Sequence, residues 1–336
     1  MNPICHALPG APAPDTRAEA PSADADSKST VILVVGAPGE EAFQEKFAAW
    51  ADRWKETTTK GDAKLITIGR DAATATNSLA QFKAALEAEP RDGFSDLWLV
   101  LIGHGTFDGK EAKFNLKGSD LSASELSTLL QPFHRRLAII NCASASAPFI
   151  NALSATNRVI ITATKSGSEQ NFARYGDHLS AALGDPEADI DKDGQVSLLE
   201  AHLTAAKRTL DAYQNDGRLP TEHSLIDDNG DKLGTPSDWF RGIRASKKAK
   251  DGAEPDGLRA HQLCLVPNEA DRRMPQELRQ RRDELELEIA RLRELKASMP
   301  EDDYYAQLET ILLRLGALYQ KADPKTAAPP TPSAKP

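Results

Sequence analysis

Cysteine is scarce in this chain. Only Cys5, Cys142 and Cys264 occur among 336 residues, too few and too widely spaced for a disulfide framework. Long apolar runs are absent as well. Polar residues interrupt each run within about ten positions, whereas a membrane-spanning helix needs about 20 apolar residues. We therefore expect no integral membrane segment.

The chain also lacks a recognisable targeting segment and an excess of positive charge. Residues 1–30 are rich in Pro, Ala, Asp and Ser, without the basic start and apolar core of a secretory signal. The compartment stays open between cytoplasmic and exported with a leader absent from this chain. With 41 Lys and Arg against 50 Asp and Glu, the net charge is −9, which argues against nucleic acid as a partner.

Apolar residues make up 40% of the chain, enough for a substantial core, and they fall into alternating strand-like and helix-like patterns. Strands are expected at 31–35, 64–68, 97–102, 137–140 and 158–162, with helices between them and further helices at 172–183 and 197–214. This alternation predicts an α/β fold with right-handed crossovers and a mostly parallel sheet sandwiched by helices.

Composition divides the chain into five segments. They are a disordered tail at 1–29, a main domain at 30–245, a linker with a short strand at 246–270, a helical hairpin at 271–323 and a second disordered tail at 324–336. The short strand is expected at 263–266, as an extra edge of the main sheet. The hairpin has the apolar spacing of paired, coiled-coil-like helices, and we expect it to be antiparallel and to serve packing or self-association.

A histidine and a cysteine each follow a buried strand. His104 comes after the apolar run 97–102, and Cys142 comes after the run 137–140. Ligands bind at the carboxyl ends of strands in open α/β sheets, so the two side chains are candidates for a base and a nucleophile facing one cleft. Gly105 and the N–H of Cys142 are the expected oxyanion donors. The alternative for each residue alone is a turn histidine and a buried apolar cysteine.

With these residues the chain resembles the caspase-like cysteine peptidases, the group of caspases, metacaspases, legumains and clostripain. Their signature is an apolar strand ending in His-Gly, followed later by an apolar strand ending in Cys. The Cys-x-Ser-x-Ser pattern from Cys142 to Ser146 is most similar to the legumain branch. The resemblance implies a caspase-like fold over about 30–245 and endopeptidase activity on protein or peptide substrates. In it, His104 is the general base, Cys142 is the nucleophile, and Gly105 and Cys142 form the oxyanion hole.

Two positions depart from that pattern. Asn141 stands before the cysteine where legumains have a small residue, and Ile140 stands where metacaspases have an acidic residue that binds basic substrates. A second hypothesis therefore stands beside the peptidase: a catalytically inactive caspase-like module that binds calcium and acts in interaction or scaffolding.

Residues 189–200 match the twelve-residue EF-hand calcium loop at each key position. The expected Ca2+ ligands are Asp189, Asp191, Asp193, the backbone carbonyl of Gln195, Ser197 and Glu200. Carboxylates at alternate positions suit a hard cation, and Gly194 permits the sharp bend. The alternative is an acidic turn whose Asp side chains cap the next helix. A second acidic run, 227–231, has only the first half of such a loop and favours an Asn-Gly turn.

Overall fold

The computed structural model describes residues 28–70, 77–250 and 253–322. The tails predicted at 1–29 and 324–336 fall almost wholly outside these ranges, as does Cys5. No helix among the described residues is long and apolar enough to cross a membrane.

Within the described residues, the central sheet has seven strands in the order β10-β9-β8-β7-β3-β1-β2. The five parallel strands are β1 (Thr30–Val35), β2 (Lys64–Ile68), β3 (Leu97–Ile102), β7 (Leu137–Asn141) and β8 (Arg158–Thr162). All five were predicted and are confirmed. The antiparallel strands β9 (Leu225–Asp227) and β10 (Thr235–Pro236), of which β10 is the edge, were not predicted, because strands this short have no detectable alternation.

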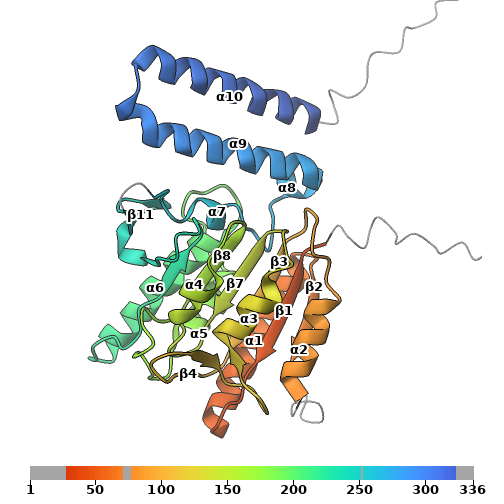
Figure 1. The fold of residues 1–336 in the computed structure, drawn as a ribbon, viewed down its shortest axis with the longest axis vertical. Helices are drawn as coiled ribbons and strands as arrows, with labels where there is room; N and C mark the ends of the chain where they lie inside the picture. The colour runs from red at the N-terminus through yellow and green to blue at the C-terminus, as the bar shows by residue number, and fades with distance from the viewer. Residues whose placement is uncertain (1–27, 71–76, 251–252, 323–336) are drawn as a thin grey trace, which may run out of the picture.

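Helices cover both faces of the sheet, as Figure 1 shows. One face packs on α1 (Glu41–Lys60), α5 (Tyr175–Ala182) and α6 (Leu198–Asn215). The other packs on α2 (Ser78–Glu87), α3 (Ala123–Leu130) and α4 (Pro148–Leu153). All residues of β1, β3, β7 and β8 are buried, as expected when helices cover a parallel sheet on two sides. The predicted sandwich is confirmed.

Short elements occupy the two ends of the sheet. A small antiparallel sheet of β4 (Gly105–Phe107), β5 (Ala112–Phe114) and β6 (Leu121–Ser122) follows β3. The hairpin β11 (Phe240–Arg241) and β12 (Arg244–Ala245) precedes α7 (Leu258–His261). Figure 1 shows β4 and α7 at opposite ends of the central sheet.

The last three α-helices of the described residues are α8 (Glu269–Arg273), α9 (Gln276–Leu295) and α10 (Glu301–Ala322). Helices α9 and α10 lie antiparallel (Figure 1), which confirms the predicted hairpin. The strand predicted at 263–266 is wrong, because that backbone has no strand pairing. Leu263 and Leu265 are buried in the core and alternate with half-buried neighbours, so an irregular segment produced the burial pattern of a strand.

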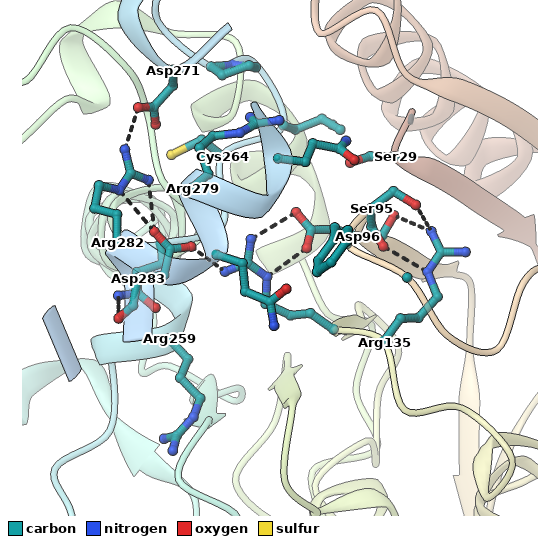
Figure 2. Close-up of a pocket in the computed structure, with 18 of the residues that line it drawn as sticks. Ser29, Ser95, Asp96, Arg135, Arg259, Cys264, Asp271, Arg279, Arg282 and Asp283 are labelled. Atoms are coloured by element: carbon teal, nitrogen blue, oxygen red, sulfur yellow. Dashed lines mark hydrogen bonds and ion pairs between the residues drawn. The ribbon is translucent and has the colours of Figure 1, made fainter. Parts of the chain in front are cut away.

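The hairpin docks on the end of the sheet where β1 and β3 begin, beside a cleft of about 480 Å³ (Figure 2). Arg136 joins the two parts there: its Nε lies 2.6 Å from Asp96 Oδ1, and its Nη1 lies 3.0 Å from Oδ2 of Asp283 on α9. Arg282 also contacts Asp283, at 2.8 Å. Because Asp283 is nearly buried, this contact depends on paired charges rather than on apolar area alone.

We predict that Arg136→Ala loosens the docking of the hairpin. The substitution leaves Asp96 without its arginine and removes one of the two arginines on Asp283, at a cost of about 1–3 kcal/mol. Amide hydrogen exchange should become faster in α9 than in β1 or β3. Arg314→Ala, which breaks an exposed ion pair with Glu288 inside the hairpin, is the matched control and should change little. Equal exchange in α9 for Arg136→Ala and wild type would contradict the prediction.

Candidate active site and cation loop

His104 stands after β3 in a cluster of aromatic rings. The centroid of its ring lies 4.9 Å from Phe43, 5.2 Å from Phe47 and 6.0 Å from Phe172. Its Nε2 lies 3.1 Å from the carbonyl oxygen of Pro38. A carbonyl oxygen only accepts hydrogen bonds, so this contact assigns the ring proton to Nε2. This hydrogen bond orients the imidazole ring and leaves Nδ1 as the unprotonated nitrogen of the neutral ring.

Cys142 stands after β7 and is completely buried. Gly176 of α5 covers it: a Cβ built on that glycine would lie 2.8 Å from the Cβ of Cys142 and 2.8 Å from the ring of Trp50. Burial raises the pKa of the Cys142 thiol to about 12, and the carboxylate of Glu222 acts in the same direction. The thiolate needed for nucleophilic attack is therefore disfavoured.

The fold brings His104 and Cys142 to neighbouring strands but does not pair them. Leu101 and Asn141 are register partners in parallel β3 and β7, so the residues that follow lie at the same end of the sheet. His104 packs on Phe47, and Cys142 belongs to the same apolar cluster as Phe47. Among the described residues, no hydrogen bond joins the imidazole to the thiol. The two side chains share a face, and their catalytic roles stay predictions.

The two N–H groups expected to bind an oxyanion have acceptors within the fold. The N–H of Cys142 donates to the carbonyl of Leu101 at 2.9 Å. The N–H of Gly105 donates to Ser144 Oγ at 3.3 Å, and that hydroxyl donates to the Gly105 carbonyl at 3.1 Å. A Cβ at Gly105 would lie 2.3 Å from the carbonyl oxygen of Ser144. Because Gly105 has no side chain, the backbone of Ser144 occupies the space next to it, where a substrate carbonyl was expected.

Sequence reasoning missed the residues that cover the thiol. Gly176 comes from α5. Glu222 comes from a loop, and its carboxylate accepts the backbone N–H groups of Arg174 and Tyr175 at 2.8 and 3.0 Å. Both residues are distant from Cys142 in the chain. No local pattern marks a glycine as a close contact or a glutamate as buried, so only the packing reveals them.

The predicted cation loop gathers carboxylates at the other end of the domain. Oxygens of Asp189, Asp191 and Asp193 lie within 4.8 Å of one another. Asp189 accepts the N–H groups of Lys192 and Gly194 at 2.7 and 3.1 Å, which shapes the turn. Burial raises the pKa of Asp193, and the charges of Asp191 and Glu200 add to the effect. Negative charges held this closely fit a divalent cation.

Glu200 closes the loop from the first turn of α6. Its Oε1 accepts the N–H of Ile190 at 2.7 Å, and its Oε2 accepts the N–H and hydroxyl of Ser197 at 2.9 and 2.8 Å. Ser197 in turn caps the helix, forming a capping box with Glu200. Both expected ligands therefore also fix the junction between loop and helix.

His261 was not predicted at this site. Its Nε2 lies 3.0 Å from Asp191 Oδ2, and ligand atoms of Asp191, Glu200 and His261 lie within 4.8 Å of one another. This histidine comes from α7, far along the chain, so its proximity follows only from the packing of α7 on α6. Gln195 is also engaged by the C-terminal segment, since its Oε1 accepts the N–H of Asn268 at 2.9 Å.

Comparison with known proteins gives only distant likenesses. No protein-family profile and no curated protein sequence matches the chain. Among solved structures it is similar to the Drosophila initiator caspase Dronc (12% identity, TM-score 0.41, covering 62% of this chain and 82% of that one). It is also similar to caspase-1 from Spodoptera frugiperda (10% identity, TM-score 0.39, 60% and 86%). A Geobacter sulfurreducens protein has 12% identity and a TM-score of 0.35 (60% and 92%).

We predict that Cys142 resists alkylation in the folded protein. With a pKa near 12 and no exposed surface, it should react with iodoacetamide at neutral pH far more slowly than a free model thiol, and it should stay slow up to about pH 9. Site-resolved mass spectrometry of timed samples measures the rate. The same protein in urea is the control, in which Cys142 should react like the model thiol. Fast labelling of the native protein would contradict the burial described here.

Proposed function

We propose that this chain is a caspase-like, calcium-binding module that is catalytically silent in the conformation described and acts in interaction or scaffolding. The observation that carries the proposal is the state of Cys142: buried, with its pKa raised to about 12 and, among the described residues, without a hydrogen bond to an imidazole. A cysteine peptidase needs the opposite, an accessible thiol of lowered pKa beside a base.

Two further contacts support silence rather than turnover, whereas the contact of His104 Nε2 with the carbonyl of Pro38 orients the ring, leaves Nδ1 able to accept a proton and favours neither. The N–H of Gly105 is engaged by Ser144 Oγ, and the N–H of Cys142 by Leu101. A substrate carbonyl would have to displace these partners before an oxyanion could be stabilised. The nucleophile is thus buried, and both oxyanion donors are engaged within the fold.

The caspase-like part of the proposal is supported by residue order and strand context. His104-Gly105 follows β3, and Cys142 follows the adjacent parallel strand β7, in the chain order of that family. The Cys-x-Ser-x-Ser pattern from Cys142 to Ser146 is similar to the legumain branch. The small residues after Cys142 are buried, which supports a structural role for this turn in the present chain.

The calcium part of the proposal is supported by the converging carboxylates of residues 189–200. Asp189, Asp191 and Asp193 would supply side-chain oxygens, and Gln195 its backbone carbonyl. Ser197 and Glu200 would complete the set. Bound calcium would neutralise the mutual repulsion of these groups. It would also tie the start of α6 to α7, because His261 contacts Asp191.

A second candidate function is a caspase-like cysteine endopeptidase whose active form differs from the described conformation. One observation favours it: His104 and Cys142 lie after register-matched positions of adjacent parallel strands. In that form α5 would move off the thiol, so that His104 could act as general base and Cys142 as nucleophile on a protein or peptide substrate.

Self-association through the hairpin also stays a prediction. Helix α10 exposes apolar side chains, with Leu312 49% exposed and Leu313 68% exposed. Tyr305 and Tyr319 are about half exposed as well. A second copy of the hairpin is the occupant we propose for this face, because paired amphipathic helices bury such side chains against each other.

We predict that the purified chain leaves a pooled peptide library uncut, with and without calcium, and that Cys142→Ala is indistinguishable from wild type. The reason is the covered thiol. Mass spectrometry of the library after long incubation makes the measurement. Cleavage by wild type that is lost in Cys142→Ala would establish the second candidate function instead.

We predict that calcium raises the melting temperature. At a hundredfold excess over Kd, one site contributes about 2.7 kcal/mol, and each kcal/mol is worth about 2–4 °C for a domain of this size. Asp189→Ala should reduce the rise, because it removes a ligand. Asp211→Ala, which removes an exposed carboxylate paired with Lys207 on α6, is the matched control. No rise up to millimolar calcium, or an undiminished rise in Asp189→Ala, would overturn the loop assignment.

A further inference from the structure

The acidic turn that follows β9 has the same backbone pattern as the predicted cation loop. In both, the first residue accepts the N–H three positions on, and the third and fifth residues each accept the N–H two positions on. The donors and acceptors are Lys192 to Asp189, Asp193 to Asp191 and Gln195 to Asp193, and correspondingly Gly230 to Asp227, Asp231 to Asn229 and Leu233 to Asp231. The fourth and sixth residues of both have positive φ: Lys192, Gly194, Gly230 and Lys232.

The two loops differ in one hydrogen bond. In the first loop, the N–H of the sixth residue, Gly194, donates to Asp189 Oδ2. In the second loop, the N–H of the sixth residue, Lys232, donates to Ser154 Oγ instead, at 3.1 Å. Asp227 Oδ2 is therefore left without the partner that its counterpart has.

Two buried carboxylate oxygens consequently lack hydrogen-bond partners among the described residues: Oδ2 of Asp227 and Oδ2 of Asp231. Asp227 is only 1% exposed. No lysine or arginine of the described chain forms an ion pair with either carboxylate. Each carboxylate accepts one backbone N–H at Oδ1, but a buried charge without a counter-ion is unfavourable, and the unpaired Oδ2 atoms are open to a water or an ion.

The surroundings hold the turn in place. Asp256 accepts the N–H groups of Asp228 and Asn229 at 2.9 and 3.1 Å and the hydroxyl of Thr235 at 2.6 Å. Burial raises the pKa of Asp227; Ser154 and the N–H of Gly230 oppose the rise, and the nearby charges of Asp231 and Asp228 add to it. The acidic side chains of the loop therefore lie close together, and no basic side chain of the described residues pairs with Asp227 or Asp231.

We propose that Asp227 and Asp231 bind a second hard divalent cation, of which calcium is the representative. Unpaired carboxylate oxygens at the first and fifth positions of such a turn are the ligands this class of ion prefers. Asp238, in the short 3-10 helix Ser237–Trp239, stands at the twelfth position from Asp227, where the first loop has Glu200. It is exposed, and it would have to move to join the site, because the ligand atoms of Asp227, Asp231 and Asp238 do not all lie within 4.8 Å of one another.

This second site adjoins the first through α7. Asp228, inside the second loop, accepts the N–H groups of Gly257, Arg259 and Ala260 at the start of α7. At the other end of that helix, His261 contacts Asp191 of the first loop. An ion in either loop would therefore act on the position of the same short helix.

Calorimetric titration of the chelator-stripped full chain with calcium tests the proposal. Wild type should bind two equivalents, and Asp231→Asn and Asp189→Ala should each bind one. Asn at 231 keeps an Oδ1 acceptor for the N–H of Leu233, so the fold is preserved while the charge is lost. Asp211→Asn is the control and should titrate like wild type. An Asp231→Asn titration equal to wild type, or no binding by wild type, would overturn the second site.

Melting temperatures separate a cation ligand from a structural residue. In chelator, Asp231→Asn should melt at or above the wild-type temperature, because an uncompensated charge is gone. In calcium, it should melt below wild type. A lower temperature in both conditions would mean a structural role and overturn the proposal. If wild type binds one equivalent that only Asp231→Asn removes, the second site stands and the proposed calcium site at 189–200 fails.

Discussion

The packing of α5 and α1 over the ends of β3 and β7 is the contact that decides whether Cys142 can react. Gly176 has no side chain, so α5 can approach Cys142 at van der Waals distance and seal it against Trp50. Burial then keeps the thiol protonated. The same end of the sheet is closed by the mutual contacts of Gly105 and Ser144. The carboxyl end of a parallel sheet commonly holds a ligand. In this chain, that end is filled by the protein's own side chains and backbone.

The opposite end of the sheet is dominated by charge. Arg136 and Arg282 neutralise Asp283 where the hairpin docks, whereas the two acidic loops keep carboxylates without a basic partner of that kind. His261 lies beside Asp191, and Arg259 donates to the backbone carbonyl of Asp228. Because α7 contacts both loops, and Gln195 of the first loop contacts Asn268 just before α8, cation binding would be coupled to the placement of the C-terminal helices. In the proposed function this end, rather than the His-Cys end, is where the molecule responds to its surroundings.

Local pattern predicted most of the architecture. The five parallel strands are continuous apolar runs, and α3 begins after its N-cap Ser122, whose side chain accepts the N–H of Glu125 at 3.1 Å. Errors came from short or irregular segments. Burial alternates along the segment around Leu263 and Leu265 as it would in a strand. Both side chains lie in the core, but the segment does not pair with the sheet. Strands β9 and β10 are too short to have a period of their own.

The sequence alone determined which residues stand at the strand ends and which turns gather acidic side chains, because strand periodicity and turn chemistry are local properties of the chain. Only the tertiary structure decided what those residues can do. The protonation of Cys142 depends on Gly176 and Glu222, and the unpaired oxygen of Asp227 depends on Ser154 taking the N–H of Lys232. Burial and hydrogen-bond partners are set by residues distant in the chain, which no local pattern records.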